Sequence, residues 1–98
     1  MSVIAELSIF PLDKGLSLSP YVARAVQIIQ QSGLPYEFGP MGTCMEGEWD
    51  KVMQTVTACF QDLAQDCTRI SMSLKVDYVQ DKNGRLQSKV SSVQERIS

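Results

Sequence analysis

The chain contains no histidine, and this absence removes most of the common catalytic and metal sites. Serine and cysteine nucleophiles usually depend on a histidine base, so the common hydrolase triads are excluded. Cysteine is scarce as well: Cys44, Cys59 and Cys67 are odd in number and form no Cys-X-X-Cys pair. We therefore expect neither a disulfide framework nor a metal site, and we interpret the three as small, buried, reduced residues.

Concentrated charge and long apolar runs are also missing. Nine basic and eleven acidic residues give a net charge of −2, and the lysines and arginines are scattered singly. Nucleic acid binding needs a concentrated basic surface, so we expect no nucleic acid partner. No glycine-rich phosphate loop, membrane-length apolar run or signal-peptide pattern is found. We expect a cytoplasmic protein that makes no membrane contact.

What remains is enough apolar sequence for one small core. A hydrophobic content of 44% and a charged content of 20% suit a single domain over residues 1–98. A chain of this length buries only about 60% of its unfolded surface, so stabilisation by self-association is expected.

Four segments show the alternation of a β-strand. They are residues 3–10, 36–38, 43–48 and 70–78. Pro11 ends the first strand because proline cannot donate to a sheet ladder. The sequence Gly39-Pro40-Met41-Gly42 predicts a hairpin turn between the second and third strands.

Helical spacing of apolar residues predicts three helices. The first has Ser19 as N-cap, Pro20 at its first position and an end near Ser32, before Gly33. The second carries one apolar stripe, formed by Trp49, Val52, Met53, Val56, Phe60 and Leu63. A short C-terminal helix follows Asn83-Gly84, with an apolar side formed by Leu86, Val90, Val93 and Ile97.

The βαββαβ order predicts an α+β fold of the ferredoxin-like type. Its antiparallel sheet has the spatial order 4-1-3-2, with both long helices on one face and a short C-terminal helix added. The opposite face is free of these helices, and a solvated polar face is one interpretation of it. Ile4, Phe10 and Val79 favour another, in which sheet faces pack between the subunits of a dimer or tetramer.

Two carboxylates on the helix-free rows, Glu6 and Glu46, are candidate functional groups. They could accept hydrogen bonds from the amino group of a ligand, or act as acid and base in a cofactor-free enzyme. They could equally bond to Lys75 or Arg69 across a subunit interface. Gly47, beside Glu46, would let a backbone or ligand approach closely.

The remaining candidate site residues each have a structural alternative. Ser17 and Ser19 could donate to a ligand, although Ser19 is first of all a helix cap. Trp49 could stack on a planar ring, although a single tryptophan at the start of an amphipathic helix is more often a core residue. Thr43 leads into the central third strand.

Four sequence blocks occur in an order that resembles one known family. They are Ala5-Glu6-Leu7 with Ile9-Phe10-Pro11-Leu12, Ser17-Leu18-Ser19-Pro20-Tyr21-Val22-Ala23, Tyr36-Glu37 and Gly42-Thr43-Cys44-Met45-Glu46-Gly47. They resemble the thiamine-binding protein family, including proteins of the YkoF type. The resemblance implies a ferredoxin-like homo-oligomer, a dimer or tetramer, that binds thiamine or its hydroxymethylpyrimidine moiety without catalysis or cofactor, in vitamin uptake or salvage.

The resemblance also implies site residues. Glu46 would be the principal acceptor, the loop of Ser17 and Ser19 would form the pocket, and Thr43 and Glu6 would lie beside it. An aminopyrimidine suits a carboxylate with hydroxyls, and a cationic thiazolium suits an acidic protein with Trp49 or Tyr36 to stack on it. The alternative is an oligomeric structural or regulatory protein that has no small ligand.

Overall fold

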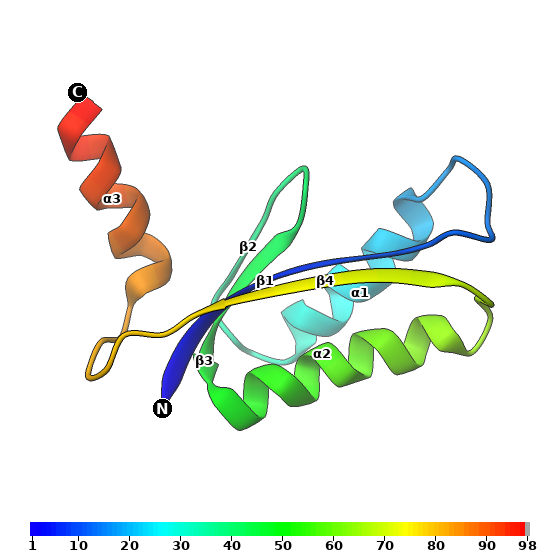
Figure 1. Ribbon diagram of the computed structural model, residues 1–98, viewed down its shortest axis with the longest axis horizontal. Helices are drawn as coiled ribbons and strands as arrows, with labels where there is room; N and C mark the ends of the chain where they lie inside the picture. The colour runs from blue at the N-terminus through cyan, green and yellow to red at the C-terminus, as the bar shows by residue number, and fades with distance from the viewer. Residues whose placement is uncertain (98) are drawn as a thin grey trace.

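The computed structural model describes residues 1–97 and has the predicted order of elements (Figure 1). The elements are β1 (Ser2–Pro11), α1 (Ser19–Gln31), β2 (Tyr36–Phe38), β3 (Thr43–Glu48), α2 (Trp49–Ala64), β4 (Ile70–Asp77) and α3 (Arg85–Ile97). The four strands form one sheet in the order β2-β3-β1-β4, which confirms the predicted 4-1-3-2 arrangement. β1 is antiparallel to both of its neighbours, β3 and β4.

The core lies between the sheet and the pair α1 and α2. One row of β1, formed by Val3, Ala5, Leu7 and Ile9, is buried as its alternation predicts. Both long helices cover this face, on the lower side of the sheet in Figure 1. Arg24 of α1 joins the helices by donating to the carboxylates of Asp62 and Asp66, at 3.0 and 2.9 Å.

The stripe predicted for α2 is wrong at two positions. Trp49 and Phe60 are 43% and 44% exposed, whereas Cys59 is completely buried and donates to the Ala25 carbonyl. The true stripe is formed by Val52, Val56, Cys59 and Leu63. Cysteine is small enough to fit where α1 and α2 approach each other, so the helix turns Cys59 inward and leaves the larger Phe60 outside.

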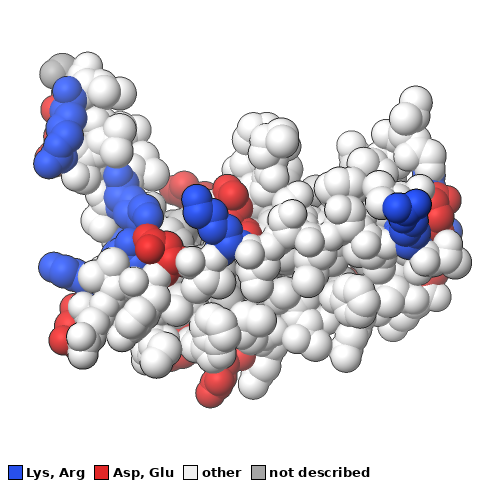
Figure 2. All heavy atoms as spheres, in the orientation of Figure 1, with Lys and Arg blue, Asp and Glu red and all other residues white. Residues whose placement is uncertain are grey.

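α3 stands apart from both layers. It rises on the helix-free side of the sheet, beyond the end of β4 (Figure 1). The apolar residues predicted to share one side of this helix do so, but no residue of α3 is buried. Basic side chains lie along it, while much of the view in Figure 2 is uncharged. No helix among residues 1–97 is long and apolar enough to span a membrane.

Candidate functional site

The principal cavity forms where β1 runs past the end of β3. The last residue pair between these strands is Leu7 with Thr43, whereas β1 continues beside β4 as far as Pro11. The edge of β1 after Leu7 is therefore open on the side where β3 would have continued. Alternate residues of such an edge present backbone N–H and C=O groups that no strand pairs. The cavity lies between this edge, the first turns of α1 and the β2–β3 hairpin.

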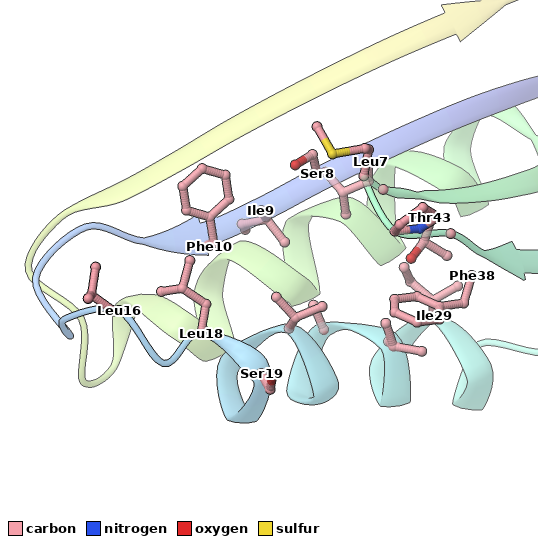
Figure 3. Close-up of a pocket in the computed structure, with 17 residues that line it drawn as sticks. Leu7, Ser8, Ile9, Phe10, Leu16, Leu18, Ser19, Ile29, Phe38 and Thr43 are labelled. Carbon is pink, nitrogen blue, oxygen red and sulfur yellow. The ribbon is translucent and has the colours of Figure 1, made fainter.

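The cavity has a volume of about 450 Å³, which lies in the usual range of small-molecule sites. Phe10, Leu16 and Leu18 lie toward one end of it, and Ile29, Phe38 and Thr43 toward the other (Figure 3). Its lining contains the hydroxyl residues Ser8, Ser19 and Thr43 and no charged side chain: Leu7, Ser8, Ile9, Phe10, Leu16, Leu18, Ser19, Val22, Ala25, Val26, Ile29, Phe38, Gly39, Pro40, Met41, Gly42 and Thr43.

Two of the six predicted site residues line this cavity. Thr43, only 4% exposed, begins β3 at the cavity. Ser19 lines it from the first turn of α1, so its predicted role as N-cap is wrong. Leu18 is the N-cap residue and makes no side-chain capping bond, which leaves the Ser19 hydroxyl free of that role. Ser17, two residues earlier, is exposed and does not line the cavity.

Glu46 is turned toward α3 instead. Its residue is 7% exposed, and its two carboxylate oxygens accept the backbone N–H groups of Arg85 and Leu86 at 2.8 and 3.1 Å. These are N–H groups of the first turn of α3, which have no partner within the helix. A carboxylate at this end also interacts favourably with the helix dipole. Glu46 is therefore the anchor of α3 within the chain, and a role in ligand binding stays a prediction.

A second contact fixes the same end of α3. Asp77, the last residue of β4, accepts hydrogen bonds from Lys89, at 2.6 Å, and from Arg85. The two cationic partners lower the pKa of Asp77 from its ordinary 3.8 to about 2, the hydrogen bond from Lys89 contributing most. Asp77 is consequently ionised at neutral pH and holds the helix by charge as well as by hydrogen bonds.

Glu6 is on the helix-free face, as predicted, but not in the cavity. It is opposite Cys44 and Lys75 in the strand register. The Cys44 thiol donates to its carboxylate at 3.8 Å, across a shallow hollow of about 210 Å³. Burial, and next the charge of Glu6, raise the pKa of Cys44. The thiol therefore stays protonated at neutral pH and is a poor nucleophile.

Glu6 and Glu46 share one sheet face but have separate surroundings. Glu6 borders the hollow, whereas the two oxygens of Glu46 are taken by α3. The arrangement gives no support to an acid and base pair acting on one substrate. Among residues 1–97, no cluster of three acidic or cysteine side chains is placed to hold a metal ion.

Trp49 and Gly47 contact other parts of the chain and lie outside the cavity. Trp49 starts α2 next to Met1, whose carbonyl accepts its backbone N–H, and it does not line the cavity. The Met1 end of β1 is about 20 Å along the strand from the cavity, at 3.3 Å per residue. The close approach at Gly47 is made by Leu34: a Cβ on Gly47 would lie 2.5 Å from the Leu34 Cδ2 atom.

Sequence reasoning missed the apolar lining, above all Phe10, Phe38 and Met41. Phe38 ends β2 and Met41 lies in the hairpin turn, and they are 62% and 83% exposed. A signal was available, because the first predicted strand is longer than the third and must overhang it. The hairpin crosses β1 closely at Gly42, where a Cβ would lie 3.1 Å from the Leu7 carbonyl oxygen.

The cavity has the chemistry of a site for a planar heteroaromatic ring. Phe10 and Phe38 provide aromatic surface on different sides of it (Figure 3). Hydroxyl groups and an open backbone edge both donate and accept hydrogen bonds, as the amino group and ring nitrogens of such a ring require. No lysine or arginine lines the cavity to hold a phosphate.

Comparisons with known proteins agree with this arrangement. The chain is 38% identical to a UPF0045 protein of Methanothermobacter thermautotrophicus over 98 residues, covering 97% of this chain and 99% of that one. The crystal structure of a hypothetical protein of Methanocaldococcus jannaschii is 34% identical, with a TM-score of 0.89 and coverage of 96% and 97%.

A structure from Thermotoga maritima, described as a candidate thiamine biosynthesis/salvage protein, is 28% identical, with a TM-score of 0.84 and coverage of 95% and 99%. The sequence model of the thiamine-binding protein family matches residues 5–94, nearly the whole chain. The chain therefore belongs to the thiamine-binding protein family.

Proposed function

We propose that the chain binds thiamine or its hydroxymethylpyrimidine moiety in the cavity beside β1, without catalysing a reaction. It would serve vitamin uptake or salvage in the cytoplasm. The observation that carries this proposal is the open edge of β1 inside an uncharged cavity with hydroxyl and aromatic groups, in a chain of this family. The Thermotoga protein of the same fold, with its candidate thiamine role, supports the same ligand class.

The aminopyrimidine ring fits the inner part of the cavity. Its amino group and ring nitrogens would bond to the Thr43 hydroxyl and to the β1 edge, with Phe38 against its face. The exposed Ser19 hydroxyl, at the other end of the cavity, would bond to the outer part of the ligand. The cationic thiazolium would sit toward the mouth, where an aromatic side chain stabilises a cation by roughly 0.5–1 kcal/mol. The net charge of −2 favours a cation over an anion.

Calorimetry on three variants tests this placement. Thr43→Val and Ser19→Ala each remove one hydroxyl with little change of shape, and we expect each to weaken binding about fivefold, for a hydrogen bond worth ~1 kcal/mol. Ser17→Ala is the matched control, because it removes an exposed hydroxyl outside the cavity. Equal affinities for all three variants and the unmutated protein would contradict this placement.

We also propose that the chain forms a homo-oligomer, a dimer or tetramer, by packing helix-free sheet faces together. Ile4 and Phe10 lie half-buried on this face, on the row of β1 opposite the row that α1 and α2 cover. Ser73, exposed on this face in the middle of the edge strand β4, gives a test. Ser73→Arg should weaken the assembly in sedimentation experiments, whereas an unchanged assembly would show that another surface is used.

A further inference from the structure

The most unusual surface of the molecule is the apolar side of α3. Val90, Val93 and Ile97 are 45%, 59% and 78% exposed and share one side of the helix. Helical spacing at positions i, i+3 and i+7 is typical of a helix that packs against something. Within residues 1–97 no element covers this side.

The base of α3 is fixed to the sheet. Glu46 accepts two N–H groups of its first turn, and Asp77 pairs with Arg85 and Lys89. A helix of 13 residues is about 20 Å long, so the far end stands well away from the sheet. The anchored base holds the direction of the helix and keeps its apolar side available.

The shape of the chain indicates a missing neighbour. Its radius of gyration is 14.4 Å, whereas a compact chain of this length has a radius of about 12.6 Å. α3 and the β2–β3 hairpin both project on the helix-free side and are separated from each other (Figure 1). Figure 2, in the same orientation, shows a concave surface between these two elements.

α3 and the β2–β3 hairpin are complementary in charge, and both expose apolar side chains. The hairpin carries the exposed apolar residues Phe38 and Met41 beside the exposed acid Glu37, whereas α3 has Arg96 beside its apolar side. Figure 2 shows basic side chains along α3 and acidic ones near the hairpin. One chain cannot join them, because α3 is anchored on the far side of the concave surface. A two-fold axis can join them, since each copy then supplies both halves of the contact.

We propose that α3 is an arm that packs on the β2–β3 hairpin of a second copy of this chain, while the hairpin receives the partner's arm. This proposal rests on the self-association proposed above. A four-stranded face is only about 19 Å wide, at about 4.8 Å between strands, and its edge strand β2 has only 3 residues. A stable interface buries roughly 800 Å² per partner, so the arms would provide the remainder. Because Phe38 and Met41 also line the cavity, the arm lies at its mouth.

Sedimentation of two pairs of variants tests the arm. Val93→Glu and Met41→Glu each place a charge in the proposed contact, and we expect each to weaken self-association at least tenfold. Ser88→Glu is the control on α3, because this exposed serine lies on the other side of the helix. Leu16→Glu is the control for Met41→Glu, because Leu16 is fully exposed at the cavity but lies on the β1–α1 loop. Glutamate favours helix more than valine does, so circular dichroism should show an intact α3.

The outcomes separate this proposal from those before it. Weakened assembly in the two contact variants, with both controls unchanged, supports the arm. Full assembly of Val93→Glu overturns the arm and leaves sheet packing to be judged by Ser73→Arg. Weakening by Val93→Glu but not by Met41→Glu overturns the hairpin as its docking place. An unmutated protein that is monomeric overturns both the arm and sheet packing, whereas the ligand proposal is judged by calorimetry alone.

Discussion

The substitution Glu46→Gln separates the structural and ligand-binding roles of one carboxylate. In the folded chain both oxygens of Glu46 accept backbone N–H groups of α3. Glutamine keeps the shape but offers one acceptor oxygen, and its NH2 group would face the second N–H donor. The first turn of α3 would then lose one bond and the favourable charge at its N-terminus.

The expected cost follows from these two contacts. Loss of a helix cap costs about 0.5–2 kcal/mol, and a hydrogen bond to a charged group contributes roughly 1.5–3 kcal/mol. We therefore expect a loss of ~2 kcal/mol, which increases local opening of α3 about 30-fold. Both hydrogen bonds of the carboxylate go to α3, so the main sheet and core should keep their stability.

Amide hydrogen exchange measures this opening directly. Exchange should become faster at Arg85, Leu86 and the rest of α3, while β1 and α2 are unaffected. Glu48→Gln is the matched control, since Glu48 is an exposed carboxylate on the same row of β3 and pairs with the chain N-terminus. Calorimetry should show unchanged thiamine affinity. A tenfold loss of affinity with unchanged exchange in α3 would refute this reasoning and make Glu46 a ligand group.

Three further predictions concern stability. Because the pKa of Asp77 is lowered to about 2, its ion pairs stabilise the base of α3 above about pH 4 and are lost as the pH falls toward 2; amide exchange should show this loss, and Asp77→Asn should remove the pH dependence. Gly47→Ala would force its Cβ against Leu34, so we expect a loss of about 1–3 kcal/mol in denaturant unfolding, and equal stability would contradict that contact. Chelators and reducing agents should leave the melting temperature unchanged, because no disulfide or metal is assigned to the three cysteines.

The sequence was sufficient to predict the sheet order and the two long helices. Alternation along β1 and β4 identifies the buried rows, and the right-handed crossover rule then fixes the topology. The error at Phe60 had a local cause. Helical spacing allows either Phe60 or Cys59 on the stripe, and only the distance between α1 and α2 decides for the smaller residue.

The site was harder to predict, because its geometry depends on distant contacts. The Glu46 carboxylate caps the first turn of α3, at residues 39 and 40 positions later in the chain. No short sequence pattern predicts a contact between residues so far apart. The cavity arises from the overhang of β1 past β3. The lengths of the predicted strands indicate an overhang, but only the register shows at which end of β3 it lies. Thr43 and Ser19 were predicted mainly through the family resemblance, whereas Phe10 and Phe38 were not among the predicted site residues.

An NMR titration with thiamine and with hydroxymethylpyrimidine tests the central claim most directly. If the cavity is the binding site, the amide signals that shift should be those of residues 7–10, 16–19 and 38–43, which surround it. Those of Trp49 and of the anchored base of α3, at Arg85 and Leu86, should move little. The absence of shifts at millimolar ligand would contradict the proposed function, and shifts centred on Glu46 and Arg85 would contradict the proposed site.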